Sequence, residues 1–171
     1  MISAKMEEAL NNQINAELYS SYLYYAMSMH FESVGLKGFA VWMKFQAQEE
    51  MMHAVKFADY LNDRDGRVKL AGIETPPSQW DNPLACFEVV LEHEQKVTKL
   101  INDLSTLAMQ ENDHAARTFL EWFVDEQVEE EANARQIIDD LKLVGSDKSG
   151  LFMINRELGQ RQPPVMPDTK A

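Results

Sequence analysis

The sequence has little of what disulfide-linked, sheet-rich or nucleic-acid-binding proteins need. Among 171 residues there is one cysteine, Cys86, so neither an internal disulfide nor a Cys-x-x-Cys metal site can form. This suits a reducing compartment, and we expect the cytoplasm. Glycine (7) and proline (6) are scarce, which favours helix over sheet. Lys and Arg number 16 against 28 Asp and Glu, and the resulting net charge of −12 argues against a nucleic-acid partner.

Long hydrophobic runs are also missing. No run approaches the ~20 apolar residues that a membrane-spanning helix needs. The first residues, Met1 to Glu8, are polar and lack the apolar segment of a signal peptide, so we expect no membrane partner. Hydrophobic residues nevertheless make up 45% of the chain, enough for the core of one domain. The acidic balance suits metal cations as partners.

The hydrophobic pattern predicts four long helices and a short one. Gly35 and the D-R-D-G stretch at 63–66 are expected to end the first two helices, and Asn82-Pro83 to begin the third. Residues 66–82 form a connection long enough to run along the outside of a bundle. The predicted helices cover residues 3–33, 37–64, 83–110, 115–144 and 147–158. The fold class is therefore all-α: an antiparallel four-helix bundle with one long crossover and a short fifth C-terminal helix.

Polar side chains interrupt the apolar face of the long helices. Glu94 is the one carboxylate in the apolar stripe of the third helix. Gln127 and Glu130 interrupt the stripe of the fourth helix in the same way. Glu17 lies seven residues from Tyr24 on one face of the first helix. The bundle is therefore expected to carry polar groups near the middle of its interior.

Residues 49–53, which read E-E-M-M-H, supply the second helix's polar groups. Glu50 and Glu49 lie three and four residues before His53, so all three can share one side of a helix. Each feature alone has an ordinary explanation, since a single glutamate often reaches water and an acidic run such as 126–131 is usually solvated. However, an antiparallel bundle brings the polar groups of all four helices to similar heights. Buried charges need a partner. The similar heights of these polar groups therefore favour a metal site.

The ligand types indicate which metals fit. Carboxylates with one imidazole and no thiolate suit Fe(II), Mn(II) or Zn(II). A carboxylate can bridge two ions, and Glu50 beside His53 is the obvious candidate. Di-metal sites in bundles commonly combine a Glu on each of two helices with a Glu-x-x-His on each of the other two. This chain has one such motif, and at the second place it has Gln127-x-x-Glu130.

Together these motifs resemble those of the non-haem ferritins of bacteria and archaea. They are N-x-Q-I-N-A-E at 11–17, Y-x-x-Y-L-Y at 19–24, E-E-M-M-H at 49–53, E-H-E at 92–94 and E-Q-V-E-E-E at 126–131. The resemblance implies an iron storage protein and ferroxidase of ferritin-like fold. Such a protein oxidises Fe(II) with dioxygen or peroxide and stores ferric mineral inside a hollow homo-oligomer, expected to have 24 subunits. We expect residues 1–160 to form one ferritin-like diiron domain, and the proline-containing residues 161–171 to form a flexible tail.

The resemblance also implies a diiron ferroxidase centre. The residues matching the ligands of one iron are Glu17, Glu50 and His53. Those matching the ligands of the second iron are Glu50, Glu94 and Gln127, with Glu130 close by.

Further residues are expected near that centre. The resemblance implies a third iron site, for which the matching residues are Glu49, Glu126, Glu129 and Glu130. It also places Tyr24 beside the diiron centre. No haem is expected.

Some alternatives stay open. A haem-containing bacterioferritin would have a second Glu-x-x-His in the fourth helix, although Met51 lies where its haem-ligating methionine would be. A rubrerythrin-like peroxidase would need four cysteines, and a mini-ferritin would lack the fifth helix. A helical bundle without catalytic activity is a further alternative.

Two features concern the expected shell. Sequence does not choose between octahedral symmetry and the looser arrangement known in archaea. Glu111, Asp113 and His114 cluster at the turn between the third and fourth helices, which the resemblance places near three-fold pores. We therefore predict that acidic groups at this turn guide iron inward.

Overall fold

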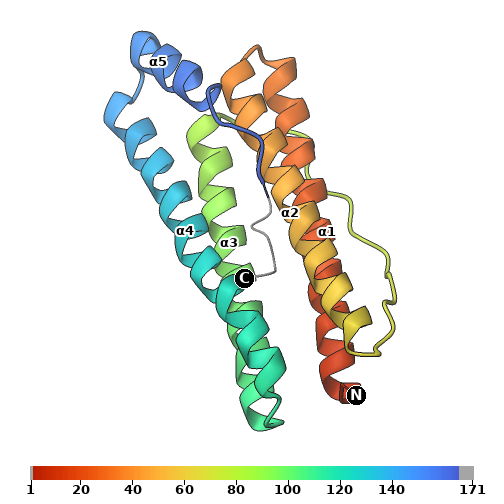
Figure 1. The fold of residues 1–171 in the computed structure, drawn as a ribbon. Coiled ribbons are helices and arrows are strands. Elements are labelled where there is room, and N and C mark those ends of the chain that lie inside the picture. Colours follow the sequence, from red (N-terminus) through yellow and green to blue (C-terminus); the bar gives the residue numbers. More distant parts are fainter. Residues whose placement is uncertain (1, 166–171) are drawn as a thin grey trace.

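The computed structural model describes residues 2–165, and Met1 and residues 166–171 lie outside this part. Residues 2–165 form five helices and no strand. The helices are α1 (Ala4–Ser33), α2 (Lys37–Asp63), α3 (Pro83–Gln110), α4 (His114–Val144) and α5 (Lys148–Leu158). Figure 1 shows α1 to α4 side by side, with α5 across one end of the bundle. The predicted all-α fold is confirmed, and every predicted helix boundary lies within one residue of the observed one.

Most helix ends follow from local side-chain chemistry. Ser3 accepts a hydrogen bond from the backbone of Met6 and caps α1, and Asn82 caps α3 directly before Pro83. Asp113 caps α4 in the same way. Between α1 and α2, Gly35 has a φ of 81°, a left-handed conformation that glycine adopts at little cost.

The crossover between α2 and α3 runs along the outside of the bundle beside α1 (Figure 1). The Asn11 amide holds its beginning, donating to the Arg67 carbonyl at 3.0 Å and accepting from the Lys69 backbone N–H at 2.6 Å. Near its end, the Trp80 ring packs edge-on against His30, with 5.4 Å between ring centroids. Because this segment returns the chain to the end where α2 began, α3 runs in the same direction as α2.

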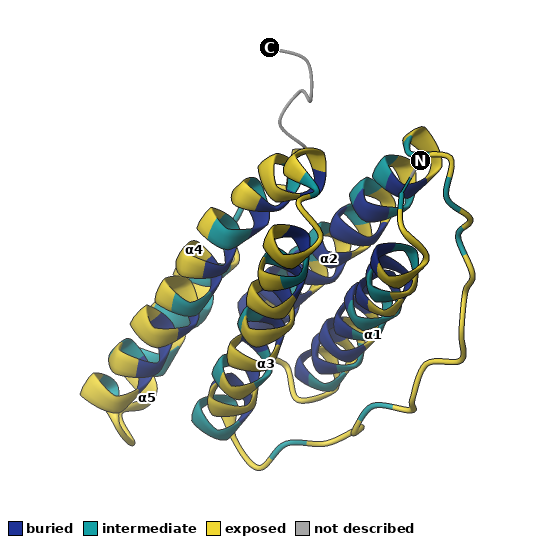
Figure 2. Cartoon of the chain, turned by 90° about the horizontal axis from the view of Figure 1, so that it is seen from below, coloured by how far each residue is buried: buried dark blue, intermediate teal, exposed yellow. Residues whose placement is uncertain are grey.

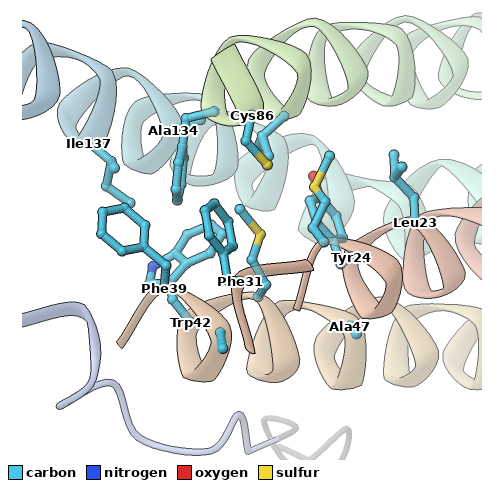
Figure 3. Packing of buried hydrophobic residues seen from close by; sticks show 14 of the residues in the cluster. Leu23, Tyr24, Phe31, Phe39, Trp42, Ala47, Cys86, Ala134 and Ile137 are labelled. Atoms are coloured by element: carbon cyan, nitrogen blue, oxygen red, sulfur yellow. The ribbon is translucent and has the colours of Figure 1, made fainter. Parts of the chain in front are cut away.

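The four long helices turn their buried faces toward one another (Figure 2). Their apolar side chains form two separate clusters, one toward the α5 end and one toward the N-terminal end of α1. The cluster near α5 joins side chains of all four long helices (Figure 3), among them Phe31, Phe39, Trp42, Cys86 and Ile137. The other cluster contains Met6, Leu10, Phe57, Leu120 and Phe123. Between these clusters the interior of the bundle is polar.

The inward face of α1 is the face that carries Glu17 and Tyr24. An apolar side through Leu10, Ile14, Leu18 and Tyr25 would bury Tyr25, but 49% of that side chain is exposed. Tyr24 is instead fully buried, in line with Glu17. The polar line of α1 therefore faces the centre of the bundle, and Tyr25 lies on its outer surface. None of the described helices combines the length and hydropathy that a membrane span requires.

α5 is fastened to the beginning of α2. Leu36 precedes α2 and offers no side-chain cap, and Asn155 of α5 accepts hydrogen bonds from the backbones of Gly38 (2.9 Å) and Phe39 (3.3 Å) instead. The approach is so close that a Cβ atom on Gly38 would lie 1.5 Å from the Asn155 carbonyl oxygen. Beyond Gly159 the chain continues along α2 (Figure 1).

Candidate metal centre

A buried polar layer separates the two apolar clusters. Each of the four long helices contributes to it, and each of its six main side chains is at most 5% exposed. The six are Glu17 of α1, Glu50 and His53 of α2, Glu94 of α3, and Gln127 and Glu130 of α4. The structure thus brings together the residues that the sequence placed at similar heights.

The α1–α2 side of this layer forms one compact group. One ligand atom from each of Glu17, Glu50 and His53 lies within 4.8 Å of the others. Nδ1 of His53 is 3.4 Å from Oε2 of Glu50, and Nε2 of Gln13 donates to Oε1 of Glu17 at 2.8 Å. Two carboxylates and an imidazole at this spacing match the hard oxygen and nitrogen ligands that divalent iron takes.

The α3–α4 side faces this group. Glu94 accepts hydrogen bonds from the Tyr24 hydroxyl and, at 3.1 Å, from Nε2 of Gln127. The same Gln127 nitrogen lies 3.3 Å from Oγ1 of Thr98. Two of the three ligands predicted for a second iron, Glu94 and Gln127, are therefore in contact, although here they are hydrogen-bonded to each other.

A second acidic group lies beside the first. Glu49, Glu126 and Glu130 each offer a carboxylate oxygen, and these oxygens lie within 4.8 Å of one another. Glu129, which was also predicted for a third site, is exposed and does not belong to that group. Glu130 takes part in both arrangements, because it lies in the buried layer and in the second acidic group.

Two glutamines that the sequence interpretation missed fix these carboxylates. Nε2 of Gln46 donates to Glu50 at 3.1 Å and to Glu130 at 2.8 Å, and it thereby joins the two groups. Gln13 holds Glu17 on the other side. A signal for both was present: each glutamine lies four residues before its glutamate, so the two share a helix face.

Burial and mutual repulsion control the protonation of the layer. Burial raises the pKa of Glu17 and of Glu130 well above the ordinary value, and the charge of Glu50 raises both further. The same two causes raise the pKa of Glu94 to about 8. A cation that binds these carboxyl groups must therefore displace protons.

Glu50 and His53 behave differently from the other members. Burial alone would raise the pKa of Glu50, but the hydrogen bond with His53 and the imidazolium charge lower it below its usual value. Burial would lower the pKa of His53, but its hydrogen bond with Glu50 and the charge of that carboxylate raise it to about 10. The metal-free layer thus holds one ion pair among protonated carboxyl groups.

Aromatic rings close the layer. Tyr24 is fully buried, and burial together with the neighbouring charge of Glu94 raises the pKa of its hydroxyl, so it stays protonated and donates to Glu94. On the opposite side, the His53 ring packs edge-on against Trp122 at 5.4 Å and Phe123 at 5.8 Å between centroids. These contacts shield the ligands from water.

The turn between α3 and α4 lies away from this layer. Oδ2 of Asp113 pairs with Arg64 at 2.9 Å, and Glu111 accepts a hydrogen bond from Ser3. His114, the third residue predicted to attract iron, is exposed. Asp113 therefore has a structural role within the subunit, as a cap and as an ion-pair partner.

Met51, the residue considered for haem binding, points away from the layer. Its side chain is 45% exposed on the outer face of α2. It lines a shallow apolar surface together with Tyr22, Tyr25 and Ile73.

Comparisons with known proteins agree with this geometry. A family model described as a ferritin-like domain matches residues 7–144. The bacterial non-heme ferritin of Bacteroides fragilis is 50% identical over 161 residues, covering 94% of this chain and 100% of that protein. The protein of the same name from Staphylococcus aureus is 37% identical over 161 residues, covering 94% and 97%.

Solved structures show the same similarity. An open pore ferritin from the hyperthermophilic archaeon Archaeoglobus fulgidus superposes with a TM-score of 0.94 and 57% identity, covering 95% of this chain and 100% of that chain. A humanized archaeal ferritin gives a TM-score of 0.95 and 53% identity, covering 96% and 100%.

Proposed function

This chain belongs to the ferritin family, and from that premise we propose that it oxidises Fe(II) with dioxygen in its buried polar layer and stores the ferric product. The observation that carries this proposal is the compact group of Glu17, Glu50 and His53, which is buried in the same layer as Glu94 and Gln127 inside a single subunit. A bundle without catalytic activity would have no reason to bury so many carboxyl groups together, because each costs free energy there.

The positions of the side chains support a ligand assignment. We assign one iron to Glu17, Glu50 and His53, and the second to Glu50, Glu94 and Gln127. Glu50 would bridge the two ions, because it belongs to the α1–α2 group and its charge also raises the pKa of Glu94. His53 ligates only one ion.

The protein's own groups then prepare the reaction. Two Fe(II) ions each supply one electron to dioxygen, and hard carboxylate oxygens favour the ferric product. The carboxyl groups whose pKa is raised lose protons as the ions bind. Tyr24 orients Glu94 through its hydrogen bond. We propose that Glu49, Glu126 and Glu130 form a third iron site, with the exposed Glu129 beside them.

The remaining features of the proposal concern the whole particle. The storage form is a hollow shell of identical subunits, and we propose 24 of them. The relatives named bacterial non-heme ferritin support a form without haem. The proposed compartment is the cytoplasm, as the single cysteine suggests.

The decisive test removes the bridging ligand. The metal-free assembled protein receives two Fe(II) ions per subunit without oxygen and is then exposed to air, while ferric absorbance and oxygen consumption are recorded. Glu50→Ala should abolish the rapid phase, because both irons lose a ligand, yet the shell should still assemble. Oxidation at the normal rate by Glu50→Ala would show that the assignment is wrong.

Glu88→Ala is the matched control. It also removes one glutamate from a long helix, but Glu88 is exposed. This variant should oxidise iron like the unmodified protein. If both variants lost the rapid phase, damage to the shell would explain the loss better than a missing ligand.

A further inference from the structure

The side chain of Arg161 reaches the acidic groups from outside the bundle. Arg161 is the first residue of the segment predicted as a flexible tail, but only 21% of its side chain is exposed. Its Nη2 lies 2.5 Å from Oε2 of Glu49. Its Nη1 donates to Oε1 of Gln46 at 2.8 Å and to the Trp42 carbonyl at 3.3 Å.

The position of Arg161 follows from how α5 docks on α2. Asn155 fixes α5 to the first turn of α2, and the chain then continues along that helix. Trp42, Gln46 and Glu49 are four and three residues apart and form one line on that face. The guanidinium lies over the Trp42 ring at 4.6 Å and spans this line.

Arg161 supplies a positive charge to the second acidic group. Among residues 2–165 it is the one Arg or Lys that makes an ion pair with a carboxylate of either group. Burial raises the pKa of Glu49, and the Arg161 charge opposes that rise. The other group has its own cation, since His53 pairs with Glu50.

Glu49 cannot serve Arg161 and a metal ion equally well. The oxygen of Glu49 that pairs with Arg161 belongs to one of three carboxylates that lie within 4.8 Å of one another. The guanidinium and a metal ion bound to the same carboxylate repel each other, and the partly buried position strengthens the repulsion. We propose that Arg161 is a displaceable counter-ion, which holds Glu49 in the metal-free subunit and must leave when a metal ion binds Glu49, Glu126 and Glu130.

This displacement has a consequence for storage. A metal ion at the second acidic group is held less tightly than its three carboxylates alone would hold it. Arg161 also anchors Gln46, which in turn holds Glu50 and Glu130, so release of the guanidinium frees an amide shared by both groups. Naming iron as the natural ion rests on the proposed function, whereas the displacement itself does not.

The test uses Zn(II), which needs no oxidation. Zn(II) is titrated into assembled metal-free shells at constant pH, and binding is measured by calorimetry and by equilibrium dialysis. Arg161→Gln should tighten one Zn(II) site per subunit by about tenfold, as expected for the loss of a competing charge-assisted contact. The affinity of the remaining sites should change less than this, because Arg161 reaches them only through Gln46. An unchanged or weaker affinity in this variant would overturn the proposal.

Two comparisons separate displacement from general damage. Arg135→Gln removes an exposed guanidinium that pairs with Glu131 on α4, and it should leave every Zn(II) affinity unchanged. Glu49→Gln should weaken the site, and adding Arg161→Gln to it should then change nothing further. If Arg161→Gln still tightens binding without Glu49, Arg161 acts elsewhere and the proposal is wrong.

The unmodified protein provides a test that does not depend on folding of a variant. Crystal structures with and without Zn(II) should show the guanidinium away from Glu49 when the second acidic group is loaded. Zn(II) bound to Glu49, Glu126 and Glu130 beside an unmoved Arg161 would refute displacement. No iron is oxidised in the Zn(II) titration or in the Zn(II) crystal structures. A negative result in these experiments therefore leaves the ferroxidase proposal intact, and a negative result in the Glu50→Ala oxidation test leaves the displacement proposal intact.

Discussion

The two halves of the bundle contribute similar carboxylates to the centre but differ in their last ligand. The α1–α2 half supplies Glu50-x-x-His53, an ionised carboxylate beside an imidazole. At the corresponding place, the α3–α4 half supplies Gln127-x-x-Glu130. An amide oxygen is neutral and binds ferric iron less strongly than a carboxylate. The difference indicates one strong and one weak position for iron.

Hydrogen bonds occupy the carboxylates of both metal-free halves, since Gln13 donates to Glu17 and Gln46 donates to Glu50 in the α1–α2 half. In the α3–α4 half, Glu94 is occupied by Tyr24 and Gln127, and Glu130 is occupied by Gln46. These contacts must rearrange before a cation can bind. Because the α3–α4 half offers the neutral amide of Gln127, we infer that the second iron binds loosely and leaves for the cavity after oxidation, so that the centre turns over its metal.

The largest effect is expected when the two halves are made alike. Gln127→Glu combined with Glu130→His gives α4 its own Glu-x-x-His. The stronger ligands should trap oxidised iron at the centre, so repeated additions of Fe(II) should be oxidised roughly tenfold more slowly. The first addition should change much less. Two irons per subunit are added repeatedly. Ferric absorbance after each addition measures the rate of oxidation, and the amount of iron retained at the centre measures the trapping.

The same motif on an exposed face of α4 is the control. Gln136→Glu with Asp139→His creates a Glu-x-x-His away from the layer, since both positions are exposed. It should leave repeated oxidation unchanged. If the unmodified protein keeps two irons per subunit at the centre through many turnovers, and the Gln127 and Glu130 double variant behaves identically, the loose-site hypothesis would be falsified.

The sequence predicted the fold well because the helix ends depend on local chemistry. Asn82 before Pro83 defines the start of α3 in the sequence and in the structure, and Gly35 forms the turn after α1. The carboxylates of the layer were also predictable, because a glutamate on an apolar stripe departs from the pattern around it. Glu94 and Glu17 are examples, and both are at most 2% exposed.

What the sequence did not predict depends on contacts between distant segments. Arg161 reaches Glu49 only because Asn155 docks against Gly38, and no periodicity connects a residue after α5 with the middle of α2. Asp113 is a second case, since Arg64 lies in another turn of the chain. Local patterns can identify an acidic residue, but they cannot say whether a cation from elsewhere already occupies it.

A smaller effect should appear in the pH dependence of stability. The folded metal-free subunit keeps a proton on Glu94 up to a pKa of about 8, whereas an unperturbed carboxyl loses it near 4.5. Between these values the folded state binds more protons, so its stability falls as pH rises. His53 acts in the same direction, because its pKa is raised from 6.5 to about 10 and its stabilising contribution is lost as pH rises through that value.

Glu94→Gln should flatten this dependence. The melting temperature of the metal-free protein, measured in a chelator at pH 5.5 and 8.5, should fall less in the variant than in the unmodified protein. A loss of 1 kcal/mol corresponds to about 2–4 °C for a chain of this length. Glu88→Gln, which changes an exposed carboxylate, should keep the full pH dependence. A melting temperature that rises from pH 5.5 to 8.5 in the unmodified protein would contradict the assignment.

The smallest effect is expected at the turn that joins α3 to α4, where the two acidic residues differ in role. Asp113 pairs with Arg64 and caps α4, whereas Glu111 is exposed and its side chain contacts only Ser3 among the side-chain hydrogen bonds of the described residues. Attraction of iron from solution is therefore expected from Glu111. Glu111→Gln should slow iron uptake by about twofold at low salt, where charge acts over ~30 Å, and hardly at all at physiological salt, where it acts over ~8 Å.

Asp113→Asn gives the contrast that makes this test specific. Asparagine caps helices as well as aspartate does, so the variant loses the ion pair with Arg64 and keeps the cap. It should lower the melting temperature slightly, and this decrease should appear at both the low and the physiological salt concentration used in the uptake measurements. Ser3→Ala serves as the control for Glu111→Gln, because it breaks the same hydrogen bond and leaves the charge of Glu111 in place. If Ser3→Ala slows uptake as much as Glu111→Gln, or if neither does so at low salt, the turn does not steer iron by its charge.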